Sequence, residues 1–259
     1  MSPLVPRRGS VLFAAALFAA ACGPAGSSGG ADGRRLTLTV FAAASLTEAF
    51  GELGGRFEAS TPGVNVAFDF ESSSALARKV RDGAPADVFA SADGATMDEV
   101  VRAGGAVDPQ VVARNRLAVL VAKGNPKQFR GLADFDRPGV VFLLCAPQVP
   151  CGRLGTLALD RAGVVAEPAS FEANVKAVVA KVTLGEADAG VVYATDVRAA
   201  EDEADGVDIE VGADPDLEAT YPVAVVRRAA HPLAARQFVD FVLSAEGQAI
   251  LARFGFRAP

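Results

Sequence analysis

The stretch LTLTVFAAASLTEAFGELGGRFEA, residues 36–59, joins an apolar run to a helical pattern. Residues 36–41 are typical of a buried strand, and residues 45–59 carry apolar side chains at helical spacing. Ser45 and Glu48 have the spacing of a capping box, in which both side chains accept hydrogen bonds from backbone N–H groups at a helix start. We therefore predict a strand, a tight turn and a helix that begins at Ser45.

The same alternation of strand and helix continues along the chain. Further strands are predicted over residues 64–70, 87–90, 117–122, 140–144, 189–193 and 221–226. Further helices are predicted over residues 74–81, 94–103, 153–162, 172–184, 233–243 and 245–253. Residues 201–216 are acidic and poor in large apolar side chains, so we expect a surface connection there. This pattern favours an α/β fold with a largely parallel sheet.

Two sets of strands and helices, with a final return segment, predict two lobes between which the chain crosses twice. We expect lobe 1 to comprise residues 34–116 and 224–259, and lobe 2 to comprise residues 117–223. In open α/β sheets, ligands bind outside the carboxyl ends of strands, where helices begin. We therefore expect the site residues at strand-to-helix turns.

The composition excludes several kinds of function. The chain has 259 residues, with 25 Lys and Arg against 31 Asp and Glu, a formal net charge of −6. An acidic chain lacks the basic face that nucleic acid requires, so we expect no nucleic-acid partner. The single histidine and three cysteines argue against a zinc site of clustered histidines and cysteines and against haem attachment.

The amino terminus has the pattern of an export signal. Arg7 and Arg8 precede an apolar run over residues 11–21, which is too short to cross a bilayer core of about 30 Å. We expect residues 1–21 to be a signal peptide and the Gly- and Ser-rich residues 22–33 to be a flexible linker.

The residues around the expected cleavage site leave two alternatives open. Ala19-Ala20-Ala21-Cys22 resembles a bacterial lipobox, in which the cysteine receives lipid and becomes the first mature residue. Lipid on Cys22 would anchor the protein at the outer face of the cytoplasmic membrane. Cleavage by ordinary signal peptidase would instead release a soluble protein into the periplasm.

Export places the two remaining cysteines in an oxidising compartment. We expect a structural disulfide between Cys145 and Cys151, across the short segment that separates them. A thiol redox protein is the alternative, but the spacing is not that of a Cys-x-x-Cys motif.

Three predicted turns carry small hydroxyl or glycine residues at helix starts. They lie at Ser45, at residues 72–74 and at residues 149–152. The first N–H groups of a helix lack acceptors within it and carry partial positive charge. Converging helix starts could therefore bind an anion without a formal cation.

Several motifs together resemble the molybdate-binding proteins of bacterial ABC transporters, which have a two-lobed type II periplasmic-binding-protein fold. The resemblance runs from about residue 36 to residue 256. It rests on VFAAASLT (40–47), SSSALAR (72–78), GAPADVFASAD (83–93), VPCG (149–152), GVVY (190–193) and YPVAVV (221–226).

The resemblance implies an oxyanion site made of hydrogen-bond donors alone. Its donors would be the hydroxyl and N–H groups of Ser45 and Ser73, the backbone N–H groups of Cys151 and Val175, and the phenol of Tyr193. The ligand would be molybdate or tungstate, with molybdenum bound only as its oxyanion, and no cofactor is implied. The implied partner is the membrane permease of an ABC transporter, and we expect a monomer that is not an enzyme.

A site of donors alone has a physical preference among anions. Molybdate is a fully ionised tetrahedral dianion near neutral pH, so it only accepts hydrogen bonds. Hydrogen phosphate carries a proton that would meet another donor and leave a buried group unpaired. A receptor for another tetrahedral oxyanion, such as sulfate or phosphate, remains the alternative of the same fold.

An exported hydrolase is the alternative from a different class. Ser45 or Ser73 would be its nucleophile and His231, the single histidine, its base. The sequence lacks a G-x-S-x-G nucleophile elbow, and His231 precedes a proline at a helix start. We therefore expect His231 to be a surface residue.

Overall fold

The computed structural model describes residues 35–209 and 214–259. The predicted signal peptide, the predicted linker and Cys22 lie outside the described residues. Within the described ranges, no helix combines the length and the apolar character needed to cross a membrane.

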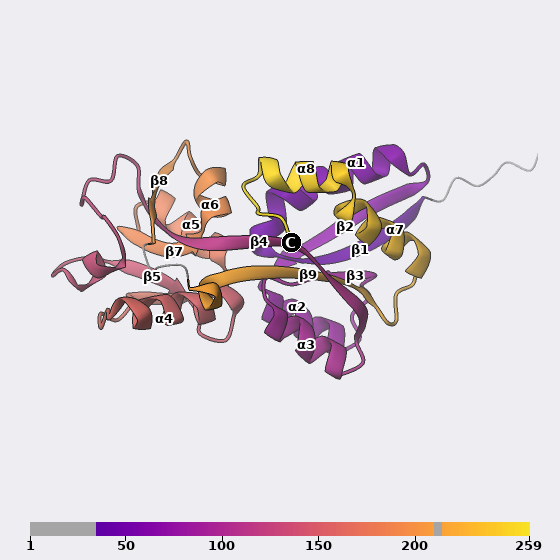
Figure 1. Ribbon diagram of the computed structural model, residues 1–259, viewed down its shortest axis with the longest axis horizontal. Helices are drawn as coiled ribbons and strands as arrows, with labels where there is room; N and C mark the ends of the chain where they lie inside the picture. Colours follow the sequence, from indigo (N-terminus) through magenta and orange to yellow (C-terminus); the bar gives the residue numbers. More distant parts are fainter. Residues whose placement is uncertain (1–34, 210–213) are drawn as a thin grey trace, which may run out of the picture. The chain divides into compact units, whose positions relative to one another are not determined.

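The described residues form one sheet of nine strands (Figure 1). Eight of them follow the order β2-β1-β3-β9-β4-β7-β5-β6, and β8 pairs with β4 beside this path. Their bounds are β1 (Leu36–Ala43), β2 (Val64–Glu71), β3 (Val88–Ala90), β4 (Ala106–Ala122), β5 (Phe142–Cys145), β6 (Ser170–Glu172), β7 (Ala189–Tyr193), β8 (Ala204–Asp208) and β9 (Glu218–Val226).

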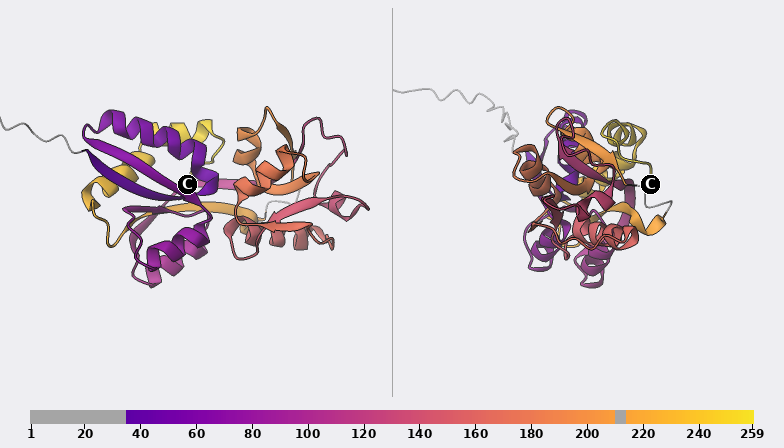
Figure 2. Two further views of the ribbon diagram at one scale, coloured as in Figure 1. Left: turned by 180° about the vertical axis from the view of Figure 1, so that it is seen from behind. Right: turned by 90° about the vertical axis from the view of Figure 1, so that its left-hand side faces the viewer.

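Helices cover both faces of the sheet, as Figures 1 and 2 show from opposite sides. Near β1–β3, helices α1, α7 and α8 lie over one face and α2 and α3 over the other. Near β5–β7, α5 and α6 lie over one face and α4 over the other. Their bounds are α1 (Thr47–Ser60), α2 (Ser73–Arg81), α3 (Gly94–Arg102), α4 (Pro150–Ala162), α5 (Val175–Thr183), α6 (Ala194–Ala199), α7 (Pro232–Leu243) and α8 (Ala245–Arg253), with short 3-10 helices at Ala44–Leu46, Leu132–Asp136 and Pro215–Leu217.

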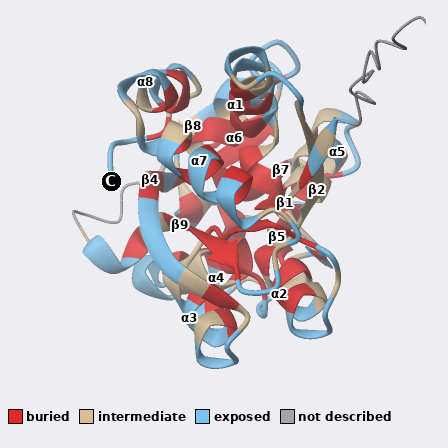
Figure 3. Cartoon of the chain, turned by 90° about the vertical axis from the view of Figure 1, so that its right-hand side faces the viewer, coloured by how far each residue is buried: buried red, intermediate tan, exposed pale blue. Residues whose placement is uncertain are grey.

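The helices bury one side against the sheet and expose the other to solvent (Figure 3). Phe50 and Phe57 of α1 pack edge-on against Phe238 of α7, with ring centroids 6.1 and 5.3 Å apart. Phe238 is fully buried, and burial of such a side chain stabilises the fold by about 1.5–3 kcal/mol. Phe50 also lies edge-on to Phe68 of β2, with ring centroids 6.3 Å apart, so the aromatic cluster holds α1 against α7 and β2.

Strand β4 changes partners along its length. Up to Arg116 it pairs with β9, where Arg116 lies opposite Glu218. From Leu117, which lies opposite Tyr193, it pairs with β7, and from Ala118 also with β8. Two long strands, β4 and β9, therefore run side by side and join the part of the sheet around β1–β3 to the part around β5–β8 (Figure 1).

The prediction of a largely parallel sheet is wrong in detail, because the sheet is mixed. Strand β1 pairs in parallel with β2 and β3, and β5 pairs in parallel with β6 and β7. All pairings of β4 and β9, the two strands that connect these sets, are antiparallel. The alternation of strands and helices identified the parallel units, but it carried no information on the direction of the returning strand.

Two further expectations need correction. The predicted strand over residues 117–122 is only the end of β4, whose first half has exposed polar positions and two register shifts. The predicted surface connection over residues 201–216 contains β8, an edge strand whose burial alternates along its length. Both segments are too polar on one face to show a buried strand in the sequence.

The predicted capping box at Ser45 and Glu48 is also wrong. Residues Ala44–Leu46 form a 3-10 turn, and α1 begins at Thr47 without a side-chain cap. The Ser45 hydroxyl instead contacts Tyr221, and Glu48 pairs with Lys176. The side chains that could cap the helix are therefore used in contacts with distant segments.

Candidate functional site

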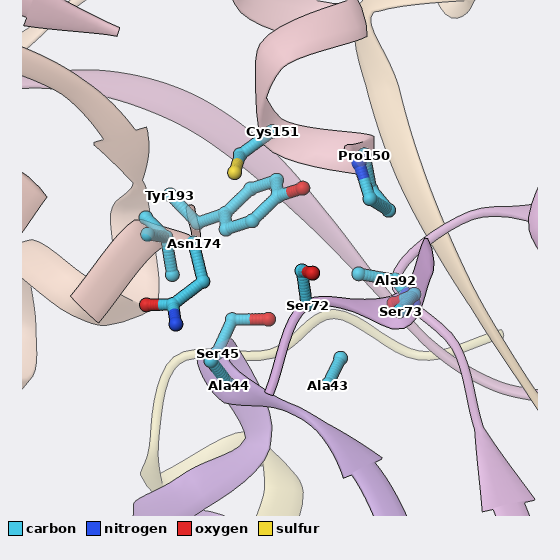
Figure 4. A pocket seen from close by; sticks show the side chains of 11 residues that line it. Ala43, Ala44, Ser45, Ser72, Ser73, Ala92, Pro150, Cys151, Asn174 and Tyr193 are labelled. Carbon is cyan, nitrogen blue, oxygen red and sulfur yellow. The ribbon is translucent and has the colours of Figure 1, made fainter. Parts of the chain in front are cut away.

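A small pocket lies where several strand-to-helix turns meet (Figure 4). It encloses about 220 Å³ of empty space, including its mouth, which suits a small ion better than a sugar or a peptide. Its lining residues are Ala43, Ala44, Ser45, Ser72, Ser73, Ala92, Pro150, Cys151, Asn174, Val175 and Tyr193. All five residues that the sequence analysis selected are among them, and their role as ligand donors stays a prediction.

Ser73 is placed at the first position of α2 and is 1% exposed. Its hydroxyl oxygen accepts a hydrogen bond of 2.9 Å from the backbone N–H of Ala92, in the turn after β3. A serine hydroxyl has a single proton. Because its oxygen already accepts from Ala92, that proton can be donated into the pocket.

Cys151 and Val175 contribute backbone groups. Cys151 is the second residue of α4, and Val175 is the first residue of α5. The N–H groups at these positions have no acceptor within the helix, and the helix dipole adds partial positive charge. Two helix starts from the far side of the pocket thus face the serines (Figure 4).

The turn before α4 is fixed by two constraints. The predicted disulfide is present and joins Cys145, at the end of β5, to Cys151, with Cα atoms 5.7 Å apart. The backbone at Gly152 lies so close to the carbonyl of Ala146 that a Cβ atom would overlap it. Together they hold the Cys151 N–H in one place.

Tyr193 ends strand β7 and is 1% exposed. Within the described part of the chain, its hydroxyl is buried and has no hydrogen-bond partner. Burial raises the pKa of this phenol well above its usual value, and the nearby Tyr221 raises it further, so the phenol stays protonated. A buried unpaired hydroxyl costs about 1–3 kcal/mol, so its presence here points to a ligand that accepts its proton.

None of the side chains in this pocket lining carries a formal charge. Two cations lie nearby, and both are paired. Lys176 Nζ lies 2.8 Å from Glu48 Oε1 and 3.0 Å from Asp196 Oδ1. Arg153 Nε donates to Asp93 at 3.1 Å.

These charged pairs affect the ionisation of their members. Burial acts to lower the pKa of the Lys176 ammonium, but Asp196 and Glu48 outweigh it and leave that pKa raised. Burial raises the pKa of the Asp196 carboxyl to about 6, against the opposing effect of Lys176. Asp196 Oδ2 also accepts the backbone N–H of Tyr193 at 3.2 Å, so it holds the end of β7.

Sequence reasoning missed several residues around the pocket. Tyr221 was part of a quoted motif but had no role assigned, and Asn115 was not singled out. Both are buried polar residues in strands, which is the signal that could have identified them. His231 does not line the pocket; it is the residue before α7, and its backbone N–H donates to Asp87.

Comparisons with known proteins agree with the geometry. A family model described as bacterial extracellular solute-binding protein matches residues 38–257. The molybdate-binding protein ModA of Mycobacterium tuberculosis is 43% identical over 243 residues, which are 92% of each chain.

Two solved structures share the fold at low sequence identity. The periplasmic molybdate-binding protein of Azotobacter vinelandii has a TM-score of 0.70 at 22% identity, covering 86% of this chain and 99% of its own. The sulfate-binding protein SubI of Mycobacterium tuberculosis has a TM-score of 0.76 at 23% identity, covering 86% and 87%. The predicted α/β fold of the type II periplasmic binding proteins is confirmed.

The relatives are binding proteins, so the expectation that this chain is not an enzyme is also confirmed. The hydrolase alternative is thereby wrong. The pocket of uncharged donors, the fold and the match over residues 38–257 lead to one conclusion. The chain belongs to the bacterial extracellular solute-binding protein family.

Proposed function

We propose that this protein captures molybdate in the pocket lined by Ser45, Ser73, Cys151, Val175 and Tyr193. The observation that carries the proposal is the buried Tyr193 hydroxyl, a donor with no acceptor among the described residues, in a pocket without charged side chains. The relative that is 43% identical over 92% of this chain is called a molybdate-binding protein, which supports the choice of ligand.

The donor set explains how a dianion can be bound without a cation. Hydrogen bonds to an ionised acceptor are about twice as strong as bonds between neutral groups. The pocket offers several such hydrogen bonds away from solvent. The donors are two serine hydroxyls, one phenol and the N–H groups of the helix starts. Tungstate, of nearly the same size and the same charge, should bind to the same donors.

We further propose that the pocket closes between two lobes, residues 34–116 with 224–259 and residues 117–223. The change of β4 partners between Arg116 and Leu117 supports a boundary there. The contacts that bridge the two lobes include Ser74 Oγ to the Gln148 carbonyl at 2.7 Å, Arg153 to Asp93, and Lys176 to Glu48.

The remaining parts of the proposal rest on membership of the family and, for the membrane anchor, on the lipobox-like residues 19–22. The loaded protein would deliver the oxyanion to the membrane permease of an ABC transporter, acting as a monomer. Lipid on Cys22 would hold it at the outer face of the cytoplasmic membrane. Mass spectrometry of the mature amino terminus tests this anchor: a diacylglyceryl cysteine as first residue supports it, and an unmodified terminus contradicts it.

Calorimetric titration with molybdate, tungstate, sulfate and phosphate tests the proposed ligand. We expect tight binding of molybdate and tungstate, weaker binding of sulfate, and the weakest binding of hydrogen phosphate. Tight sulfate binding with no response to molybdate would contradict the proposal.

Sulfate is the second candidate, because it is also a tetrahedral dianion that only accepts hydrogen bonds. The structural likeness to the sulfate-binding protein SubI shows that this fold is shared by proteins named for either ligand. The spacing of the donors would have to discriminate between the two ions. Competition between sulfate and bound molybdate measures this discrimination.

A further inference from the structure

Four buried polar side chains form a continuous hydrogen-bonded chain behind the pocket. Ser45 Oγ lies 3.0 Å from Tyr221 Oη, and Asn115 Nδ2 donates to Tyr221 Oη at 3.4 Å and to Thr195 Oγ1 at 2.8 Å. All four residues are at most 5% exposed. Asn115 lies in β4 and Tyr221 in β9, the two strands that connect the halves of the sheet.

The orientation of the Asn115 amide is fixed by its neighbour. Its Oδ1 atom accepts the backbone N–H of Arg116 at 2.9 Å, so the amide nitrogen must face Tyr221 and Thr195. An amide nitrogen donates hydrogen bonds and accepts none. Tyr221 Oη therefore accepts a hydrogen bond from Asn115 and cannot donate its own proton on that side.

Among the described residues, this leaves Ser45 Oγ as the acceptor for the phenol proton of Tyr221. Burial raises the pKa of Tyr221, so the proton is present, and the other partner within reach is Ser45 Oγ. If Ser45 donated to Tyr221 instead, the phenol proton would be buried without an acceptor, at a cost of about 1–3 kcal/mol. Tyr221 must donate and Ser45 must accept.

We infer that Tyr221, held by Asn115, is a positioning residue that makes Ser45 a donor to the bound oxyanion. Because Ser45 Oγ accepts a hydrogen bond from Tyr221, the serine proton is not used on that side and can be donated to the pocket. Ser73 reaches the same state through the N–H of Ala92. The proton of each serine is thus left for an oxyanion that accepts hydrogen bonds. This inference rests on the proposed function and adds residues outside the pocket lining to it.

A double-mutant cycle on Ser45 and Tyr221 tests the inference. Calorimetry measures the molybdate dissociation constant of the wild type, Ser45→Ala, Tyr221→Phe and the double variant. If Tyr221 acts through the Ser45 proton, each single change weakens binding, Ser45→Ala by about tenfold. The double variant should then bind as weakly as Ser45→Ala alone, within about twofold.

Thr195→Val is the matched control. It removes another hydroxyl from the same row of hydrogen-bonded side chains, while the hydrogen bond between Tyr221 and Ser45 is kept. Its effect on the dissociation constant should be smaller than that of Tyr221→Phe. Additive losses in the cycle, or an equal loss in Thr195→Val, would overturn the inference.

The same experiment separates this inference from the proposed ligand. If the wild type binds sulfate and not molybdate, the proposed ligand is wrong, and the cycle is measured with sulfate, which also needs Ser45 as a donor. If the wild type binds molybdate and the cycle is additive, only the inference fails. A wild type that binds neither ion overturns both.

Discussion

The pocket lining and the charged residues just outside it use opposite chemistry. The lining consists of small or apolar side chains, serine hydroxyls, the Asn174 amide and the Tyr193 phenol, which has no hydrogen-bond partner among the described residues. Around it lies what we call the ion-pair belt: Glu48, Lys176 and Asp196 on one side, and Asp93 with Arg153 on the other. The charged side chains form ion pairs between distant segments, whereas uncharged hydrogen-bond donors face the ligand site.

This division has a physical advantage for selectivity. A lysine or arginine in the pocket would attract any anion, whatever its protonation state. Fixed donors instead require an acceptor at each position, so a ligand that must donate leaves a buried group unpaired. We therefore expect substitutions in the pocket lining to weaken ligand binding far more than substitutions in the ion-pair belt.

Tyr193→Phe should have the largest effect on binding. It removes the unpaired phenol, so the molybdate dissociation constant should rise by about tenfold or more. The thermal stability of the ligand-free protein should stay the same or rise, because an unsatisfied buried hydroxyl is lost. Calorimetry and thermal unfolding without ligand measure the two effects. Unchanged affinity with lowered stability would show that Tyr193 is a structural residue.

Loss of the disulfide should have an intermediate effect. The bridge spans a sequence separation of 6, and closing so short a loop stabilises the fold by about 2 kcal/mol. Reduction, or a Cys145→Ser and Cys151→Ser double change, should lower the melting temperature and weaken molybdate binding about fivefold, because the Cys151 N–H is less well fixed. Equal molybdate affinities with and without reductant would show that the disulfide does not affect ligand binding.

Glu48→Gln should have a smaller effect on binding. The carboxylate is partly exposed, and such ion pairs contribute about 0.2–1 kcal/mol, so the dissociation constant should rise about twofold. Raising the salt concentration should weaken wild-type binding by a similar factor and leave the variant less affected. A tenfold loss in Glu48→Gln would mean that the belt, and not the lining, dominates binding.

Asp196→Asn should leave binding nearly unchanged and alter the pH dependence of stability. Because burial raises the pKa of this carboxyl to about 6, the folded state favours its protonated form. That contribution is present at low pH and is lost as pH rises through about 6. The unfolding free energy of Asp196→Asn relative to wild type should therefore increase between about pH 4 and pH 7. Denaturant unfolding across this range measures it, and a constant difference would contradict the shifted ionisation.

The strand-to-helix units were predictable from the sequence because their apolar patterns are local. The turns at Ser45, Ser73 and Cys151 follow buried strands or begin helices, so their convergence at the carboxyl ends of strands could be expected. The Val175 and Tyr193 assignments came from the resemblance to a family. The structure places all five in one pocket lining, although their contacts with a ligand stay a prediction.

The parts that the sequence did not reveal depend on long-range contacts. The first half of β4 is stabilised by pairing with β9, more than 100 residues later, and its polar face hides the strand. The partners of Ser45 and Lys176 are also distant in sequence: Tyr221 lies 176 residues from Ser45, and Glu48 lies 128 residues from Lys176. The local spacing of Ser45 and Glu48 predicts a capping box, but in the structure these side chains contact Tyr221 and Lys176 instead.

A crystal structure of the protein with bound molybdate would show which groups hold the anion. We expect anion oxygens within hydrogen-bond distance of the Ser45, Ser73 and Tyr193 hydroxyls and of the Cys151 and Val175 N–H groups. Lys176 and Arg153 should remain in their pairs with Glu48, Asp196 and Asp93. A lysine or arginine side chain that contacts the anion directly, or an anion bound away from Tyr193, would contradict this expectation.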